Sequence, residues 1–286
     1  MQLARRRLCS GLVVASALAP CHAARTWTLA QAGVAPPNQD ERKAALVIGN
    51  SAYRVGALKN PVNDAQAVAA SLRALGFDVM LRENASLRDM IESFRQFSIA
   101  TRSAPVRVVF YAGHGVQVKG RNYLLPVDTE IRAEDEVAAK SADLNELLER
   151  LSATKQGISI VILDACRNNP FSGVEILGPD GRRLKFRGAT PAGLAPVEAP
   201  LGSMVAFSTA PGGVALDNPG DRNSLYTKHL LASMQAPGLP VELLFKQVRL
   251  AVARETGRVQ VPWESSSLTG DFCFMPGANG TCNMER

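Results

Sequence analysis

The fold class is decided by "AALVIGN" (44–50) and by the two segments that follow it. A continuous apolar run that ends in Gly-Asn is expected of a strand buried on both faces of a parallel sheet. "NPVNDAQAVAASLRALG" (60–76) then has helical spacing, with a proline near its start and Gly76 as a stop signal. "FDVMLRE" (77–83) predicts a second strand. A strand, a helix and a strand in this order favour a parallel α/β arrangement.

The same alternation continues along the chain. Strands that alternate with amphipathic helices indicate a three-layer α/β fold with a mostly parallel central sheet flanked by helices. The chain has 286 residues, 46% of them hydrophobic, and no internal repeat, so we expect one globular domain. We expect helices at 86–100 (with Ser86 as N-cap), 142–153, 224–234 and 240–256, strands at 106–112, 158–166 and 203–209, and a short strand or extended loop at 122–128.

The N-terminus has a different composition from the rest of the chain. An arginine triplet (5–7) precedes the apolar stretch "LCSGLVVASALAP", and small residues follow. This layout predicts a signal peptide over residues 1–23, too short to span a membrane comfortably, and therefore a periplasmic or secreted protein. A lipid anchor at Cys21 is the alternative. Residues 24–41 are rich in Ala, Pro and Gln and predict a flexible leader.

Removal of the signal peptide changes the charge and the cysteine count of the chain. The formal net charge falls from +6 to +3, which is too weakly basic to predict nucleic-acid binding. Three cysteines remain. Cys273 and Cys282 flank the turn-forming "PGANG" and can form a disulfide in an oxidising compartment, which leaves Cys166 free. The alternative is that all three cysteines are reduced.

The predicted sheet brings a histidine and a cysteine to one edge. His114 follows the strand at 106–112, and Cys166 ends the strand at 158–166. Open parallel sheets place their binding crevice beyond the carboxyl ends of the strands. A thiol becomes a strong nucleophile when an imidazole removes its proton, and backbone N–H groups, here those of Gly115 and Cys166, can stabilise an oxyanion. Alone, each side chain also fits a structural role, as a turn histidine or a small buried thiol. Together they favour catalysis.

These motifs also carry a family resemblance. "FYAGHG" (110–115), followed by "DACRNNPF" with its cysteine 52 residues after the histidine, resembles the caspase-like cysteine peptidases, particularly the bacterial relatives of metacaspases and paracaspases. "ALVIGNSAY" and "PWESSSLTGDFCF" are similar to the two ends of the same domain, so the resemblance covers residues 42–275. It implies a caspase-like fold with a peptide or protein substrate and no cofactor. Calcium dependence is a trait of the family that the resemblance does not by itself carry over to this chain, and its ligands are unknown.

By this resemblance, the chain is a cysteine endopeptidase with His114 and Cys166 as its catalytic dyad. The backbone N–H groups of Gly115 and Cys166 take the oxyanion-hole positions. The competing interpretation is a non-proteolytic caspase-like binding or regulatory module whose dyad is present but unused. A third is a hydrolase of the same fold that acts on a small amide.

Two aspartates bear on specificity. Side chains alternate along an extended segment, so Asp164 and Cys166 project to the same side of their strand. A carboxylate there opposes thiolate formation, a cost that makes sense if it receives a cationic substrate side chain. Asp64, in "NPVND", is its expected partner. Both match the acidic S1 positions of metacaspases, which implies cleavage after Arg or Lys. The alternatives are a helix cap for Asp64 and a structural hydrogen bond for Asp164.

The segment 167–201 interrupts the alternation and contains the basic cluster "GRRLKFRG". A segment this long without predicted structure is usually functional or mobile. It lies where caspase relatives have an inter-subunit linker, so self-cleavage within 180–190 is one hypothesis and a solvated basic loop is the other. The acidic "EDE" (134–136) can bind a cation, although a solvated loop is the simpler explanation. Residues 276–286 form the expected C-terminal tail.

Overall fold

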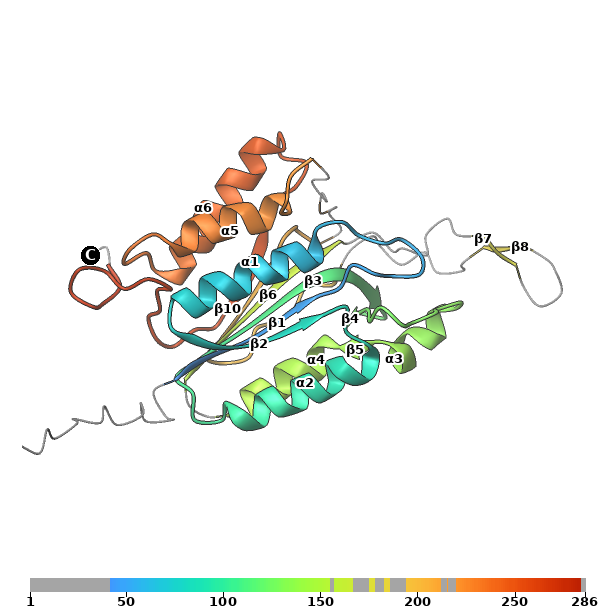
Figure 1. Cartoon of the computed structure of the whole chain (residues 1–286), viewed down its shortest axis with the longest axis horizontal. Helices are drawn as coiled ribbons and strands as arrows, with labels where there is room; N and C mark the ends of the chain where they lie inside the picture. The colour runs from blue at the N-terminus through green and yellow to red at the C-terminus, as the bar shows by residue number, and fades with distance from the viewer. Residues whose placement is uncertain are drawn as a thin grey trace, which may run out of the picture. The chain divides into compact units, whose positions relative to one another are not determined.

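The central sheet of the computed structural model has the strand order β10-β9-β6-β3-β1-β2, with the short strands β4 and β5 attached beside β3 (Figure 1). All neighbours along this order are parallel except β9 and β10, which are antiparallel. The strands are β1 (Lys43–Gly49), β2 (Phe77–Glu83), β3 (Val106–Val118), β4 (Arg121–Leu124), β5 (Ala142–Asp143), β6 (Ile158–Cys166), β9 (Ser203–Phe207) and β10 (Trp263–Ser266).

The structure describes residues 42–154, 157–166, 194–211, 215 and 220–283, together with the strands at 175–177 and 183–185. The described residues belong to one unit, Pro37–Arg286. The predicted signal peptide and leader lie outside them. None of the described helices is long and apolar enough to cross a membrane.

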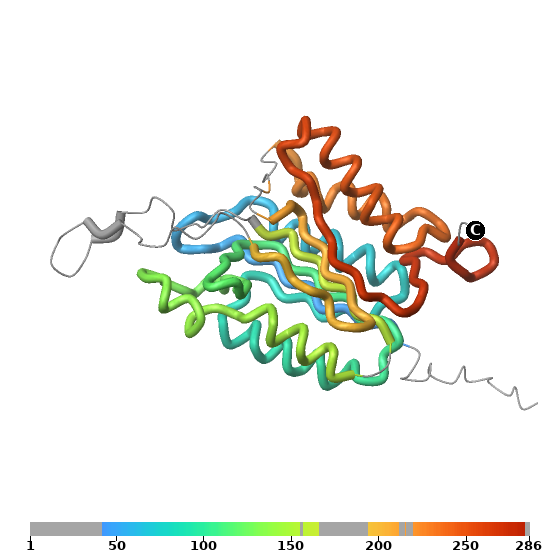
Figure 2. The backbone as a smooth tube through the Cα atoms, turned by 180° about the vertical axis from the view of Figure 1, so that it is seen from behind, coloured from blue at the N-terminus to red at the C-terminus, as the bar shows by residue number. Residues whose placement is uncertain are grey.

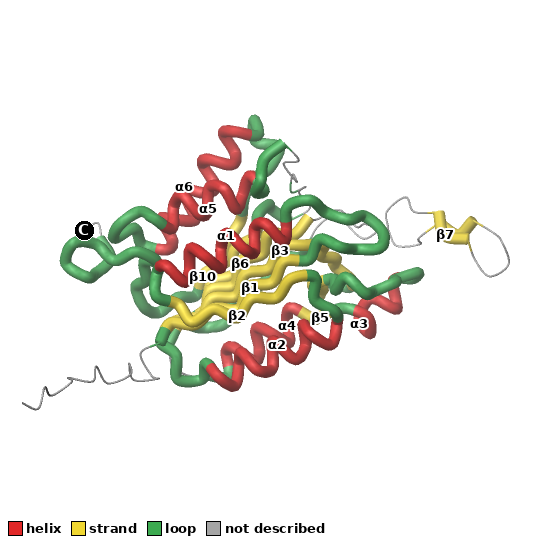
Figure 3. Tube along the Cα trace, viewed as in Figure 1, coloured by secondary structure: helices red, strands yellow, loops and turns green. Residues whose placement is uncertain are grey.

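Helices cover both faces of the sheet, which confirms the predicted three-layer α/β fold (Figures 1 and 3). One face packs against α1, α5 and α6, and the other against α2 and α4. Alternate residues of each strand point to opposite faces of the sheet and pack in two separate cores. Val47 lies in the core beneath α1, α5 and α6, Ile48 lies in the core beneath α2 and α4, and both are fully buried. The helices are α1 (Pro61–Ala74), α2 (Leu87–Ala100), α4 (Leu144–Ser152), α5 (Leu225–Met234) and α6 (Val241–Glu255).

Local signals set the helix starts. Pro61 occupies the first turn of α1, where its missing N–H costs nothing. Ser86 caps α2 and forms a capping box with Asp89, as its position predicts. Asp143 caps α4, and Ser224 caps α5 by accepting a hydrogen bond from the backbone N–H of Thr227.

The strand that carries His114 is longer than the sequence predicts. We expected it to end at residue 112, but β3 runs to Val118. It pairs with β6 in parallel as far as His114, and with β4 in an antiparallel ladder from Gly115 onward. His114 therefore lies inside a strand where the pairing partner changes, and not in a turn beyond the strand.

Several short elements have no counterpart in the sequence prediction. The edge strand β10 lies along β9, as Figure 2 shows from behind. A 3₁₀ turn (Glu134–Glu136) leads into α3 (Val137–Lys140). Within the segment 167–201, which we expected to lack structure, β7 (Glu175–Leu177) and β8 (Arg183–Lys185) form an antiparallel pair.

The end of that segment packs on the domain. Leu194 and Ala195 are buried. The side chain of Asn122 donates to the carbonyl of Ala195 and accepts from its N–H, at 3.0 and 2.6 Å. The C-terminal part is also fixed, because Cys273 and Cys282 form a disulfide, which decides between the two alternatives that the sequence left open.

Candidate active site

The register of the sheet brings the two candidate catalytic residues together. His114 on β3 is the Cα partner of Cys166, the last residue of β6. The two strands are hydrogen-bonded over the nine residue pairs from Val106–Ile158 to His114–Cys166. The relative position of the two backbones therefore depends on a continuous ladder and not on a loop.

The imidazole of His114 is buried, with 6% of the residue exposed. Its Nε2 lies 2.6 Å from the carbonyl oxygen of Gly56. A carbonyl can only accept, so Nε2 carries a hydrogen and donates it. In a neutral imidazole the other nitrogen, Nδ1, is then the basic one. The ring also packs against Tyr53, with centroids 4.4 Å apart.

Sequence reasoning did not identify Gly56 as part of this site. The group that binds His114 is a backbone carbonyl, which every residue possesses, so no side chain indicates its role. The only available signal is a glycine in the loop between β1 and α1, where it has a φ of 72°. Glycine adopts this left-handed conformation without the steric cost that a Cβ brings.

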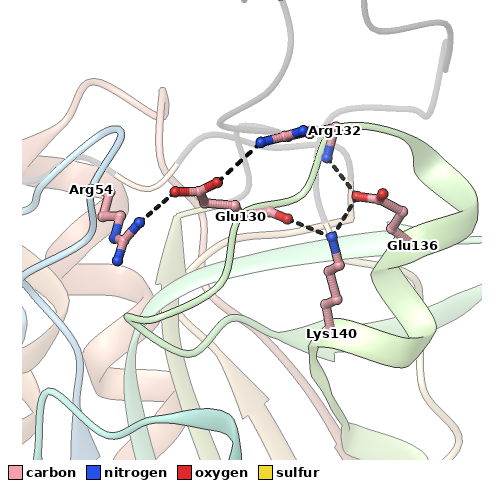
Figure 4. Close-up of polar contacts among 5 residues, drawn as sticks. All are labelled: Arg54, Glu130, Arg132, Glu136 and Lys140. Atoms are coloured by element: carbon pink, nitrogen blue, oxygen red, sulfur yellow. Dashed lines mark hydrogen bonds and ion pairs between the residues drawn. The ribbon is translucent and has the colours of Figure 1, made fainter. Parts of the chain in front are cut away.

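Two sets of contacts hold this loop in place. The side chain of Asn84 accepts from the backbone N–H groups of Ser51 and Ala52, both at 2.9 Å. Further along the loop, Arg54 forms an ion pair of 2.5 Å with Glu130 (Figure 4). Arg54 lowers the pKa of Glu130 through this hydrogen bond and through its charge.

Further charged residues from the segment after β4 join this ion pair in a network (Figure 4). Arg132 lies 3.5 Å from Glu130, and Lys140 donates to the backbone carbonyl of Glu130 and to the carboxylate of Glu136. Hydrogen bonds from the backbone of Arg132 and from Lys140 lower the pKa of Glu136. The acidic "EDE" thus lies in a 3₁₀ turn with cationic neighbours. Within the described part of the chain, no group of three or more metal-binding side chains is present.

Gly115 follows His114 in β3 and pairs with Leu124 of β4. A Cβ at this position would lie 3.1 Å from a methyl group of Leu194 and 3.4 Å from the Cβ of Ala165. The absence of a side chain therefore lets β3 lie close to the residue before Cys166. Gly115 directly follows His114, the residue that pairs with Cys166 in the register of β3 and β6.

The two aspartates predicted for substrate binding converge on one residue. Ser224 donates its backbone N–H to Asp64 at 3.0 Å, and its hydroxyl donates to Asp164 in a short hydrogen bond. Asp64 and Asp164 are 1% and 8% exposed. Asp64 does not cap its own helix, whose N-cap is Asn60. Both carboxylates lie at the edge of the sheet where β6 ends.

Two further neutral donors from the start of α5 bind these carboxylates. Asn223 donates its side-chain amide to Asp64 at 2.8 Å, and Thr227 donates its hydroxyl to Asp164 at 2.9 Å. The sequence prediction missed both residues and Ser224, since they are about 160 residues from Asp64. Next to them, burial and the charge of Asp164 raise the pKa of Tyr226 well above its usual value.

His229, the other histidine among the described residues, lies on α5 and contacts Glu255 at 2.7 Å. It is partly buried, as its helical context predicts. Its Nε2 contacts the carboxylate of Glu255, the last residue of α6.

Comparisons with known proteins show which family and fold this chain resembles. A family model described as the caspase domain matches residues 42–273. The chain is 28% identical over 128 residues to human "Mucosa-associated lymphoid tissue lymphoma translocation protein 1", and 27% identical over the same length to its mouse homologue. These matches cover 44% of this chain and only 15% of the relatives. A crystal structure of caspase-1 from Spodoptera frugiperda has a TM-score of 0.60 at 18% identity, over 85% of this chain and 93% of that one, and it supports the fold.

Proposed function

Because the chain belongs to the caspase-domain family of cysteine peptidases, we propose that it is an endopeptidase that cleaves after Arg or Lys through Cys166 and His114. The observation that carries the proposal is the register pairing of these two residues at the carboxyl end of the sheet. Protein or peptide substrates follow from the family. The specificity and the roles of individual residues are our inference.

The proposed chemistry begins with proton transfer from the Cys166 thiol to Nδ1 of His114. The thiolate then forms a bond to the carbonyl carbon of the substrate, and the carbonyl electron pair moves to oxygen. The N–H groups of Gly115 and Cys166 stabilise that oxyanion. When the C–N bond breaks, the imidazolium gives its proton to the leaving amine. Water, deprotonated by the same imidazole, hydrolyses the thioester and restores the thiol.

The carbonyl of Gly56 supports this assignment of the imidazole nitrogens. Since Gly56 accepts a hydrogen bond from Nε2, the tautomer with a basic Nδ1 is favoured. The same contact stabilises the imidazolium that forms when Nδ1 gains a proton, because the carbonyl dipole points its negative end at the ring. The carbonyl of Gly56 therefore orients the imidazole of His114, the proposed base.

The preference for Arg or Lys is supported by the two buried carboxylates that meet at Ser224, one of them two residues before Cys166 in β6. Asp64 accepts hydrogen bonds from Asn223 and Ser224, and Asp164 accepts them from Ser224 and Thr227, which suits ionised carboxylates. A guanidinium or ammonium group is the complement of such a pair. The same contacts also anchor the start of α5, so the structural and the specificity roles coexist.

Two further proposals concern the rest of the chain. Self-cleavage within 180–190 fits a basic preference, and most of that stretch lies outside the described residues. Export from the cytoplasm fits the Cys273–Cys282 disulfide, since such bonds persist in oxidising compartments. The predicted signal peptide lies outside the described residues as well.

The direct test uses matched fluorogenic peptides that end in Arg, Lys or Asp, with and without calcium. The mature protein should hydrolyse the Arg and Lys peptides, and Cys166→Ala should hydrolyse none. Cleavage only after Asp would contradict the proposed pocket and retain the dyad. If no peptide is hydrolysed and iodoacetamide does not alkylate Cys166, the results would favour a non-proteolytic regulatory module.

A further inference from the structure

We propose that Tyr53 and Tyr111 form a hydroxyl pair that positions His114 for catalysis by fixing its main chain; the proposal rests on the function assigned above. The sequence prediction placed Tyr111 in the core. The structure has it there, but the two phenols meet with their oxygens 3.2 Å apart. Both are buried.

The two hydroxyls bind the two backbone groups of the same residue. The N–H of His114 donates to the Tyr53 oxygen at 2.9 Å. The Tyr111 hydroxyl donates to the His114 carbonyl at 2.7 Å. If Tyr53 donates to Tyr111, the hydrogen bonds run in one direction from the N–H of His114, through both phenols, to its carbonyl. Chains of this kind polarise one another and strengthen each bond.

The backbone needs such support because of its neighbours. Glycines flank His114 on both sides, and glycine restricts the chain less than any other residue. His114 also lies where β3 changes its partner from β6 to β4. The position of the imidazole therefore depends on what holds the His114 peptide groups.

Gly113 leaves room for the two hydroxyls because it has no side chain. It has a φ of +153°, and a Cβ there would lie 2.5 Å from the Tyr53 oxygen and 2.7 Å from the Tyr111 oxygen. Real Cβ atoms do not approach other atoms this closely. The two phenols thus occupy the space that any side chain at 113 would need.

The pair also links the backbone of His114 to its orienting carbonyl. Tyr53 lies three residues before Gly56 in the same loop, and its ring packs on the imidazole. A second acceptor, the carbonyl of Leu125, lies 3.0 Å from the Tyr111 hydroxyl and 3.2 Å from that of Tyr53. One loop therefore contacts the backbone, the ring face and Nε2 of His114.

The test replaces each hydroxyl with hydrogen: Tyr53→Phe and Tyr111→Phe, with Tyr123→Phe as the matched control. Tyr123 is a buried tyrosine in the same apolar cluster as Tyr53. The buried N–H or C=O of His114 loses a partner in the first two variants, so kcat should fall about 10-fold to 100-fold while KM changes less than about 2-fold. Tyr123→Phe should match the wild type.

A second readout does not depend on activity. The chain has three histidines, His22, His114 and His229. In ¹⁵N spectra of protein from which the first is absent and in which the third is replaced by Gln, only the His114 ring remains. In its neutral form, the wild type should hold the Nε2–H tautomer, and both Phe variants should populate the Nδ1–H tautomer as well.

These readouts separate the possible failures. Unchanged kcat and an unchanged tautomer in both variants would overturn the proposal. A lower kcat with the wild-type tautomer, or an equal loss in Tyr123→Phe, would also overturn it, because the phenols would then act only through stability. If the wild type hydrolyses no peptide, the proposed function fails, and the tautomer still decides whether the phenols position His114.

Discussion

His114 and Cys166 are direct partners in the parallel pairing of β3 and β6, although 52 residues separate them in the chain. The proposed catalytic pair therefore lies on two central strands of the sheet. Rigid elements hold reacting groups more accurately than loops do. Gly56 and Tyr53, which form hydrogen bonds with His114, come from the loop between β1 and α1.

The first prediction concerns the base. His114→Ala should lower kcat/KM by about 10³-fold or more, since the thiol then lacks its proton acceptor. His229→Ala is the matched control, because this histidine lies on α5 and forms a hydrogen bond with Glu255 of α6. Its kcat/KM should stay within about twofold of the wild type. Equal losses in both variants would contradict the assignment of His114.

The second prediction concerns specificity. Asp64→Asn and Asp164→Asn keep the shape of each side chain and remove its charge. A hydrogen bond to a charged group contributes about 1.5–3 kcal/mol, so kcat/KM for Arg and Lys peptides should fall about 10-fold to 100-fold. The loss should appear with cationic peptides and be absent with a citrulline peptide of the same length. A loss of the same size with citrulline would assign the aspartates a structural role alone.

The third prediction concerns the residue that joins these carboxylates. Ser224→Ala removes the cap of α5 and a donor to Asp164, so it should lower the free energy of unfolding by about 1–2 kcal/mol. Tyr226→Phe, two residues away, is the control. Among the described residues its buried hydroxyl has no hydrogen-bond partner, and its removal should cost less than about 0.5 kcal/mol. Urea denaturation of both variants measures the difference.

The fourth prediction concerns pH. The pKa of Glu130 is lowered by Arg54 from its ordinary 4.5. A carboxyl with a depressed pKa stabilises the fold above its unfolded pKa, and this contribution is lost as the pH falls through the folded pKa. The pair is therefore intact throughout the neutral range. Arg54→Gln should raise the pKa of Glu130 towards 4.5 in an NMR titration and leave the pH profile of kcat/KM above about pH 6 unchanged. An altered profile there would contradict this account.

The fifth prediction concerns the disulfide. It closes a loop of nine residues, and the chain-entropy model gives such a loop about 2–3 kcal/mol. Replacement of both Cys273 and Cys282 by Ser should lower stability by this amount. Hydrolysis at 25 °C should persist, because Cys166 remains. Loss of activity in a variant that is still folded would place the tail close to the active site.

Most of the fold could be predicted from periodicity. The ends of β2 and β6 agree with the predicted segments to the residue, and the Ser86 cap is confirmed. The continuation of β3 past residue 112 was not predicted, because the glycines at 113 and 115 are normally turn signals. Pairing with β4 overrides that local preference. The short edge strand β10, "WESS", was missed because it lacks the apolar run by which a buried strand is predicted.

The site could be predicted only in its side chains with distinctive chemistry. His114, Asp164 and Cys166 lie where the pairing of β3 with β6 ends, and Asp64 lies in the first turn of α1. A parallel sheet gathers functional groups at this edge. Gly56 contacts His114 through its backbone carbonyl. Ser224 binds the two aspartates through its backbone N–H and its side-chain hydroxyl. Such groups occur throughout any sequence, so only the folded geometry distinguishes these two.

The most direct test of the central claim is identification of the bonds that the protein cuts. Incubation of a denatured protein mixture with the mature protein, followed by mass spectrometry of the new termini, gives the residue before each cut. We predict Arg or Lys at that position and no new termini with Cys166→Ala. Cuts after other residues, or cuts that persist in Cys166→Ala, would contradict the account.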